Sequence, residues 1–329
     1  MRYLVTGGAG FVGSHVALTL LDAGHDVVIL DNLSTGHRAA VPPGAQFEQV
    51  DLLNTAEVER IVSQGPWNAV LHFAALSLVG ASMVEPYHYL RQNTLTSLNL
   101  IEACTKYGVK RFVFSSTAAL FGGDDRPPPI ADDALIDPGS PYGESKFFIE
   151  RALLWADRIH GMRHACLRYF NAAGADLQGR LGEDHRPETH LIPLTIDAML
   201  GRRPPLKLFG NDYPTSDGTC IRDYIHVADL ADAHIRAIDQ LNDRSVTYNL
   251  GNGQGFSNLD VIQSVARVSG RNVPWEWAPR REGDPSVLVA DSSRIRRETG
   301  WNPQFGDIDT IVETALRWRV DHPNGYDIS

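Results

Sequence analysis

The stretch Leu4-Val5-Thr6-Gly7-Gly8-Ala9-Gly10-Phe11-Val12-Gly13 decides the fold expected for this chain. A short strand pattern runs directly into a turn rich in glycine, and a helix pattern follows. Glycines permit a tight turn, a close approach of the backbone to a pyrophosphate, and close packing of helix on strand. The free N–H groups of the helix N-terminus can then bind phosphates. The stretch therefore predicts a dinucleotide-binding turn.

The acidic residue Asp31 follows Gly13 by 18 residues, at the end of the second strand pattern. A carboxylate there accepts a hydrogen bond from the adenosine ribose 2′-hydroxyl and repels a 2′-phosphate, so we expect NAD rather than NADP. Asp51 can accept from the adenine amino group or cap the helix that follows before Ala56, and the two roles are compatible. The predicted cofactor-binding residues in this half are Gly7, Gly10, Phe11, Val12, Gly13, Asp31, Asn32, Asp51, Leu52, Phe73, Ala74 and Ala75.

Strand and helix patterns alternate along the first half of the chain, which is the mark of βαβ units and a parallel sheet. The predicted strands are 3–6, 27–30, 47–50, 69–73, 111–115 and 165–168, and the predicted helices are 12–23, 55–62, 87–107 and 142–160. We therefore predict an α/β fold with a doubly wound parallel sheet over residues 1–172.

Residues 173–329 are rich in Gly, Pro and polar residues and predict a smaller mixed α/β domain beside the sheet, from which segments can return to the first domain. Helices are expected at 191–200, 227–241, 257–268 and 307–320, and short strands at 206–209 and 248–250.

Composition limits the classes of partner. The chain has 329 residues and a formal net charge of -10, which argues against nucleic acid or an anionic membrane surface. Its 3 cysteines are widely separated and lack C-x-x-C spacing, so we expect reduced thiols, no disulfide and no metal site. We see no secretory signal and no apolar segment long enough to span a bilayer, so we expect a cytoplasmic protein.

Tyr142 and Lys146 lie four residues apart in the run Ser140-Pro141-Tyr142-Gly143-Glu144-Ser145-Lys146. On a helix such residues share one face, so the ammonium can lie near the phenol. A free tyrosine has a pKa of about 10, and a nearby cation in a dry site lowers it. The pair predicts a tyrosine base, although Tyr-x-x-x-Lys pairs also occur on solvated helix faces.

These motifs occur together in one order. The glycine turn, Asp31, Phe73-Ala74-Ala75, Ser115-Ser116-Thr117 and Tyr142-x-x-x-Lys146 resemble the extended short-chain dehydrogenase/reductases. Three further stretches, Leu167–Asn171, Gly210–Val227 and Pro279–Asp284, resemble the UDP-glucose 4-epimerase family more closely. The resemblance covers both halves of the chain.

The resemblance implies a reversible 4-epimerisation of a UDP-hexose through a 4-keto sugar, with tightly held NAD that is regenerated in each turnover. Tyr142 would take the proton of the sugar 4-hydroxyl, Lys146 would lower the pKa of Tyr142 and bond the nicotinamide ribose, and Thr117 would bond the same sugar oxygen. The resemblance adds the cofactor residues Asn93 and Phe170, and it assigns the UDP-sugar to Asn171, Leu191, Arg222, Arg281, Asp284 and Leu288. It also implies a homodimer.

The chain departs from the family pattern at several positions. Ser77 replaces a lysine that some relatives carry beside the cofactor, Phe121 lacks the hydroxyl of the commoner tyrosine, and His190 replaces an asparagine. Leu288 is smaller than the tyrosine of strict hexose enzymes. We therefore hypothesise some turnover of UDP-N-acetylglucosamine.

Other activities occur on the same fold. A 4,6-dehydratase is disfavoured because Ala118-Ala119 follow Thr117 where an acid and a base are needed. A UDP-pentose 4-epimerase and a UDP-N-acetylhexosamine 4-epimerase use the same chemistry and remain open. A non-catalytic NAD-sensing protein would not need Tyr142 and Lys146, and a net dehydrogenase would release NADH in each cycle.

Overall fold

The computed structural model describes residues 1–122, 127–281 and 284–327. A seven-stranded sheet with the strand order β11-β6-β5-β4-β1-β2-β3 forms the centre, and every neighbouring pair in it is parallel. The strands are β1 (Arg2–Thr6), β2 (Asp26–Asp31), β3 (Gln46–Gln49), β4 (Ala69–His72), β5 (Arg111–Thr117), β6 (Arg163–Tyr169) and β11 (Val246–Leu250). The strand order reverses between β1 and β4, so the predicted doubly wound sheet is confirmed.

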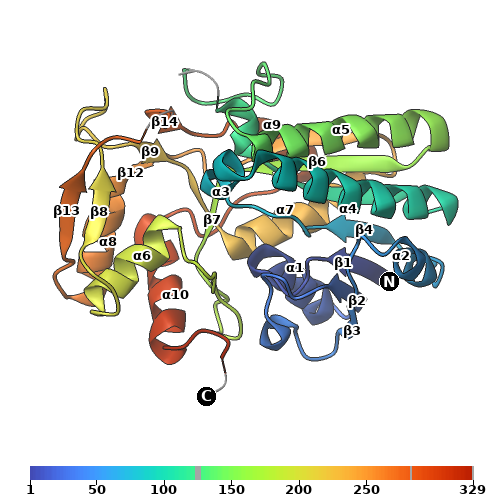
Figure 1. Ribbon diagram of the computed structural model, residues 1–329, viewed down its shortest axis with the longest axis horizontal. Coiled ribbons are helices and arrows are strands. Elements are labelled where there is room, and N and C mark those ends of the chain that lie inside the picture. The colour runs from blue at the N-terminus through green and yellow to red at the C-terminus, as the bar shows by residue number, and fades with distance from the viewer. Residues whose placement is uncertain (123–126, 282–283, 328–329) are drawn as a thin grey trace.

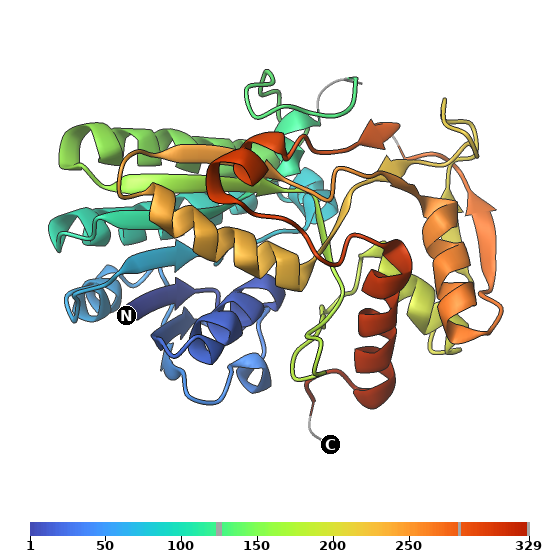
Figure 2. The same cartoon turned by 180° about the vertical axis from the view of Figure 1, so that it is seen from behind.

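Helices cover both faces of the sheet (Figures 1 and 2). One face carries α2 (Thr55–Val62), α4 (Pro86–Lys106) and α5 (Pro141–His160), whose apolar residues form one core with the strands. The other face carries α1 (Phe11–Asp22) and α7 (Val227–Gln240), which lie side by side over a second core. Two cores therefore bury the sheet on both sides, as a parallel sheet requires.

Local sequence explains where the key helix α5 begins and ends. The Ser140 hydroxyl accepts a hydrogen bond from Gly143 N at 3.2 Å, and Pro141 occupies the first turn, where its missing N–H costs nothing. Gly161 ends the helix in the left-handed conformation, with φ 66°. These signals fix the register that places Tyr142 and Lys146 on one face.

The second half of the chain builds a smaller unit at the left of Figure 1. Its core joins α6 (Leu191–Met199), α8 (Asn258–Ser269) and α10 (Ile308–Asp321) with β8 (Leu206–Phe209) and β13 (Trp275–Ala278). The remaining elements of the second half are β7 (Asn171–Ala173), β9 (Ile221–Arg222), β10 (Tyr224–His226), β12 (Phe256–Ser257), β14 (Val287–Leu288) and α9 (Ser293–Thr299). The remaining elements of the first half are α3 (Val79–Val84) and the 3₁₀ turns η1 (Arg38–Ala40) and η2 (Ala118–Phe121).

Both ends of every predicted helix lie within one residue of the ends of an observed helix. The ends of the predicted strands lie within two residues of the observed ends. The predicted strand near 248–250 was expected in the smaller unit. The structure pairs β11 with β6, and α7 packs on α1, so part of the second half returns to the first domain. The boundary at residues 172 and 173 otherwise stays a prediction.

Candidate functional site

The glycine turn connects β1 to α1 at the carboxyl edge of the sheet. A Cβ at Gly7, whose φ is 70°, would lie 2.5 Å from Ala74 N, and a Cβ at Gly13 would lie 2.2 Å from Gly7 O. Both positions therefore require glycine. Gly10 caps α1 without any side-chain hydrogen bond, which leaves backbone N–H groups of the first turn for an anion. The turn therefore fits a dinucleotide pyrophosphate.

Asp31 ends β2 directly below this turn. Its Oδ2 accepts from Ala9 N at 3.0 Å, and its Oδ1 accepts from Leu33 N at 2.8 Å. Burial raises the pKa of this carboxyl, while the two backbone N–H groups oppose the shift. The carboxylate is thus held rigidly at the position where a ribose hydroxyl is expected.

Asn32 and Asp51 lie together at the neighbouring strand ends. The Asn32 amide donates to Asp51 Oδ2 at 3.1 Å, and Asp51 Oδ1 accepts from Leu53 N at 2.8 Å. The alternative in which Asp51 caps α2 is wrong, because Asn54 is the N-cap and accepts from Glu57 N. The predicted contact of Asp51 and Leu52 with adenine stays a prediction.

The segment after β4 passes close to the glycine turn. Gly7 lies against the backbone of Phe73 and Ala74, and the Phe73 ring lies 5.0 Å from the ring of His234 on α7. Ser77, farther along, is exposed. The small residues after β4 therefore allow a close approach of two backbones, and the predicted contact of this segment with the cofactor is untested.

Asn93 on α4 has a role that the sequence did not reveal. Its Oδ1 accepts from Leu76 N at 2.8 Å, and its Nδ2 donates to Leu76 O at 3.0 Å and to Ser145 Oγ at 3.0 Å. Both amide hydrogens are therefore used within the protein. The structure shows Asn93 as a clamp between the loop after β4 and α5, whereas its predicted contact with the cofactor is untested.

Tyr142 lies at the N-terminus of α5, facing the end of β5. Burial raises the pKa of its phenol, and a hydrogen bond with the Thr117 side chain opposes this shift. Thr117 also caps η2 by accepting from Ala119 N at 3.1 Å. The structure thus brings the predicted base together with its predicted hydroxyl partner.

Lys146 is buried one turn further along α5. Its Nζ donates to Ser115 O at 2.8 Å and lies 4.8 Å from the centre of the Phe114 ring and 5.9 Å from that of Tyr142. Burial lowers the pKa of Lys146 to about 7, and Glu150 partly opposes this. Burial also raises the pKa of Tyr142, and the predicted lowering of that pKa by Lys146 stays a prediction.

Sequence reasoning missed several residues that hold this centre. The Ser145 hydroxyl donates to Tyr142 O at 2.7 Å. Glu150, four residues after Lys146, accepts from Ser116 Oγ at 2.6 Å and forms a buried ion pair with Arg168 at 2.6 Å. These contacts tie α5 to β5 and β6. The spacing of Glu150 from Lys146 is a signal that points to the same helix face, but the partner on β6 is not visible in the sequence.

The predicted substrate residues gather at the boundary with the smaller unit. Strands β9 and β14 are parallel and place Leu288 opposite Arg222. The Arg222 guanidinium pairs with Asp284, and Asn171 Nδ2 donates to Asp223 O at 3.1 Å. Arg222, Asp284 and Leu288 are thus neighbours across β9 and β14, which the sequence order alone does not show.

The other predicted substrate and cofactor residues lie on different elements. Arg281 lies over the Phe209 ring, with Cζ 4.0 Å from its centre, and Leu191 is the first residue of α6. Phe170 and Leu288 pack on an apolar cluster that includes Phe121. The residues 282 and 283 of the Pro279–Asp284 motif lie outside the described residues.

Comparison with known proteins decides the family. Residues 3–251 match the model of the "NAD dependent epimerase/dehydratase family". The chain belongs to this family. Membership agrees with the NAD predicted from Asp31, and the turn described above has the backbone geometry to hold it.

Individual relatives are similar over nearly the whole chain. A UDP-glucose 4-epimerase of Lacticaseibacillus casei is 46% identical over 99% of both chains. The structure of UDP-glucose 4-epimerase from Bifidobacterium longum in complex with NAD+ and UDP is 35% identical, with a TM-score of 0.93 over 99% of this chain and 100% of that one. The UDP-Glc/GlcNAc 4-epimerase of Campylobacter jejuni is 40% identical, with a TM-score of 0.85 over 97% and 99%.

A helix that crosses a bilayer must be long and predominantly apolar. Within residues 1–122, 127–281 and 284–327, none of the helices combines the length and the apolar character of a membrane-crossing segment. All three cysteines are buried with free thiols.

Proposed function

We propose that the protein catalyses the reversible 4-epimerisation of a UDP-hexose, interconverting UDP-glucose and UDP-galactose. The observation that carries this proposal is the grouping of the buried Tyr142 phenol with Lys146, whose Nζ lies 5.9 Å from the centre of the Tyr142 ring, and with the Thr117 side chain. The full-length similarity to UDP-glucose 4-epimerases supports the same substrate class.

Oxidised NAD, when bound, supplies the hydride acceptor and donor for sugar C4 and a positive charge near the phenol. Tyr142 accepts the proton of the 4-hydroxyl and returns it in the reverse step, while the Thr117 hydroxyl donates to the same oxygen. Lys146 would hold the nicotinamide ribose of the bound cofactor. Because burial raises the pKa of Tyr142, this base needs both neighbouring cations to work at neutral pH.

We assign the UDP portion to the group that surrounds β9. Arg222 and Arg281 bind the diphosphate, since planar guanidinium groups match phosphate oxygens. Asp284 accepts from the uridine ribose, and Asn171 and Leu191 complete the pocket. The ion pair of Arg222 with Asp284 keeps both side chains in place before substrate binds. The nucleotide can then stay anchored while the keto sugar turns.

The residues after Thr117 favour epimerisation over dehydration. Elimination of the 6-hydroxyl needs an additional acid and base, but buried Ala118 and the half-buried Ala119 occupy η2 directly after Thr117. A UDP-pentose 4-epimerase remains the second candidate, because the same residues serve a sugar without C6.

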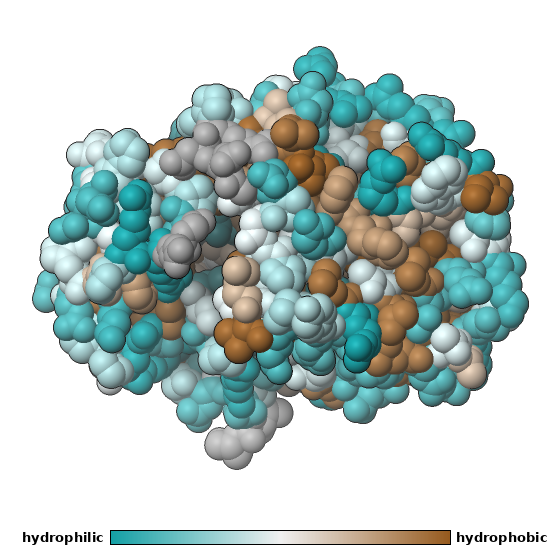
Figure 3. Space-filling model, turned by 45° about the horizontal axis from the view of Figure 1, so that its top comes forward, coloured by the Kyte–Doolittle hydropathy of each residue, from teal (hydrophilic) through white to brown (hydrophobic). Residues whose placement is uncertain are grey.

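We further propose that the protein acts as a cytoplasmic homodimer that pairs through α4 and α5. These helices expose Tyr87, Leu95, Phe148, Trp155 and Ile159. Figure 3 shows brown side chains gathered over this part of the surface. A second copy would cover these apolar side chains. Size-exclusion chromatography with light scattering measures the assembly, and a monomer at micromolar concentration would contradict the proposal.

The function is tested by offering UDP-galactose, UDP-N-acetylgalactosamine and UDP-xylose separately, without added NAD, and identifying each product. We expect UDP-glucose from UDP-galactose, at a rate that added NAD does not raise. Steady accumulation of NADH absorbance would instead identify a net dehydrogenase. Turnover of UDP-xylose alone would favour the pentose enzyme.

The size of Leu288 bears on whether the pocket accepts an N-acetylhexosamine. The place of this leucine opposite Arg222, and against the apolar cluster on which Phe170 also packs, puts an aliphatic side chain at the proposed sugar pocket. We predict that Leu288→Tyr lowers kcat/KM for the N-acetylhexosamine substrate by about 10-fold to 100-fold, with a smaller effect on UDP-galactose, because pocket volume is worth about 1–3 kcal/mol. Leu288→Met is the volume-matched control. A wild-type enzyme without activity on N-acetyl sugars would refute the hypothesis.

A further inference from the structure

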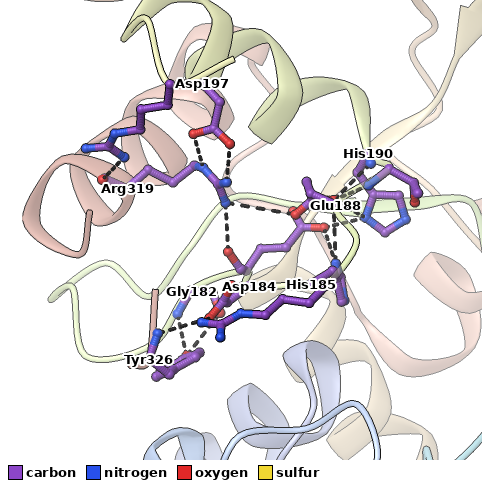
Figure 4. Close-up of polar contacts among 12 residues, drawn as sticks. Gly182, Asp184, His185, Glu188, His190, Asp197, Arg319 and Tyr326 are labelled. Carbon is purple, nitrogen blue, oxygen red and sulfur yellow. Dashed lines mark hydrogen bonds and ion pairs between the residues drawn. The ribbon is translucent and has the colours of Figure 1, made fainter. Parts of the chain in front are cut away.

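The segment from Gly182 to Leu191 passes between the glycine turn and α6, and it carries a compact cluster of ionisable side chains. Glu183, His185, Glu188 and His190 each direct one nitrogen or oxygen atom inward, and these four atoms lie within 4.8 Å of one another. Figure 4 shows His185, Glu188 and His190 pointing toward one another from this one segment. None of the four belongs to the proposed catalytic centre.

The distances within the cluster range from direct hydrogen-bond contact to 4.8 Å and include the spacing expected between the ligands of a small cation. His185 Nδ1 lies 3.2 Å from Glu183 Oε1 and 3.7 Å from Glu188 Oε1. His190 Nδ1 contacts Glu183 Oε1 and lies 4.0 Å from Glu188 Oε1. Ligands bonded to zinc at about 2.0–2.1 Å in a tetrahedron lie about 3.3 Å apart. The four atoms are therefore already close to coordination distance.

Burial gives a second and independent indication. The Glu183 and Glu188 side chains are only 7% and 9% exposed. Glu188 Oε2 is buried without a hydrogen-bond partner among the described residues, and its nearest cation is Arg319 Nη1 at 3.9 Å. A buried carboxylate oxygen is costly unless it is paired or bound to a metal. The two buried carboxylates therefore require positive charge, which the two imidazoles and Arg319 supply in this structure and which a bound cation would supply in place of the imidazole protons.

The surrounding contacts hold the carboxylates in position. Thr189 N and His190 N donate to Glu188 Oε1 at 2.8 and 2.9 Å. Arg319 donates to Glu183 O at 3.1 Å and is itself fixed by an ion pair with Asp197. Because these side chains are already fixed, they would lose little conformational entropy when an ion binds.

We propose that Glu183, His185, Glu188 and His190 form a structural site for one divalent transition-metal ion, best matched by Zn²⁺. Two imidazoles and two carboxylates suit zinc, whereas Mg²⁺ and Ca²⁺ prefer all-oxygen sites of higher coordination number. Two carboxylates balance the charge of the ion. Four protein ligands leave no open position, so the site is structural. His190 is half exposed and provides the entry path.

The position of the site gives it a function in assembling the nucleotide-binding surfaces. The His185 ring lies edge to face against Phe11 of the glycine turn, with centroids 6.3 Å apart. His190 is the N-cap residue of α6, directly before Leu191. One ion would therefore fasten the turn that holds the cofactor to the helix proposed to meet the substrate. The sequence predicted no metal site, since the cysteines lack C-x-x-C spacing and a metal role of His190 with His185 was not expected.

The test uses the full chain without an affinity tag, in the form obtained from purification. Bound metal is measured by inductively coupled plasma mass spectrometry after extensive dialysis. Metal-stripped protein is then titrated with Zn²⁺, with Mg²⁺ and with Co²⁺, whose tetrahedral complexes have strong visible absorption. The variants are Glu183→Gln and His185→Gln. The matched control is His37→Gln, since His37 contacts Asp184 of the same segment at 3.5 Å without belonging to the cluster.

We expect about one equivalent of Zn²⁺ per chain in the wild type and in His37→Gln, a tetrahedral cobalt spectrum, and loss of both in His185→Gln. A chelator should lower the melting temperature of the wild type and leave that of His185→Gln unchanged. If Glu183→Gln does not fold, His185→Gln and the cobalt spectrum still decide. The proposal is overturned if the wild type binds no Zn²⁺ at micromolar concentration, or if His185→Gln retains the metal.

Discussion

Two buried cationic side chains belong to or contact helix α5, and they differ in whether a carboxylate pairs with them. Lys146 lies on the helix itself, donates to one backbone carbonyl, and forms no ion pair within 4 Å among the residues that the structure describes. Arg168 lies on β6 and forms two short hydrogen bonds to the Glu150 carboxylate, at 2.9 and 2.6 Å. Both side chains are almost fully excluded from solvent.

The difference in pairing has opposite effects on the two groups. Burial lowers the pKa of Lys146 to about 7. Burial would also lower the pKa of Arg168, but the hydrogen bonds and charge of Glu150 raise it above its ordinary value. A paired cation keeps its proton and serves the scaffold, whereas an unpaired one responds to what binds beside it. The N-terminal part of α5, with Tyr142 and Lys146, is therefore its chemical end, and the part around Glu150 is its structural middle.

The largest effect is expected at the chemical end. Tyr142→Phe removes the hydroxyl that bonds Thr117 and keeps the buried ring, so the fold should persist. We predict that kcat falls about 10²-fold to 10⁴-fold, the usual contribution of a positioned acid or base. Steady-state kinetics with UDP-galactose measure this effect. Tyr169→Phe is the matched control, since it removes a nearby buried hydroxyl bonded to Ser115, and equal losses in both variants would contradict the assignment.

The next effect belongs to the structural middle of α5. Glu150→Gln keeps the shape of the side chain but leaves the Arg168 charge buried without a carboxylate. We predict that the free energy of unfolding falls by about 3–5 kcal/mol, as for other broken buried pairs. Urea denaturation followed by circular dichroism measures it. Glu313→Gln, exposed on α10, should change stability by less than about 0.5 kcal/mol. An unchanged midpoint for Glu150→Gln would remove the distinction.

The features that the sequence predicted well are those encoded by neighbouring residues. The glycine turn and the four-residue spacing of Tyr142 and Lys146 depend on local backbone geometry. Each of these is found in the structure. The alternation of strands and helices likewise predicted the doubly wound sheet.

The features that were missed depend on contacts between distant segments. The Glu150–Arg168 pair and the clamp of Leu76 by Asn93 form only when α4, α5 and β6 take their places in the layers. The strand β11 joins the main sheet although its local pattern resembles any short strand. Asn54, rather than Asp51, caps α2 because the helix begins three residues later than Asp51 would require. Burial, which raises the pKa of Tyr142, also depends on tertiary packing.

A smaller effect tests the unpaired cation directly. The folded-state pKa of Lys146, about 7, lies below the unfolded value of about 10.4. Between these values the unfolded chain binds one more proton, so stability rises with pH from about 7 to 10. We predict that Lys146→Met, with nucleotide removed, is more stable than the wild type at pH 7 by a few kcal/mol, and that the gap narrows toward pH 10.

Urea midpoints at several pH values, compared as differences between the two proteins, isolate this contribution from that of other titrating groups. The exposed Lys110→Met serves as the control and should show no such pH-dependent gap. A constant difference between Lys146→Met and the wild type would mean that Lys146 stays charged when buried, and the contrast with Arg168 would then be lost.

The smallest effect concerns the hydroxyl that supports the base. Thr117→Val keeps the shape of the side chain but removes the hydrogen bond that lowers the pKa of Tyr142. Since a hydrogen bond to a charged group is worth about 1.5–3 kcal/mol, we predict a loss of about 10-fold to 100-fold in kcat, with the acidic limb of the pH–rate profile moved to higher pH. Thr117→Ser retains the hydroxyl and should stay within a few-fold of the wild type. If Thr117→Val lowered kcat without moving the acidic limb, Thr117 would act on the sugar alone, and burial of Tyr142 would be offset only by the cations beside it.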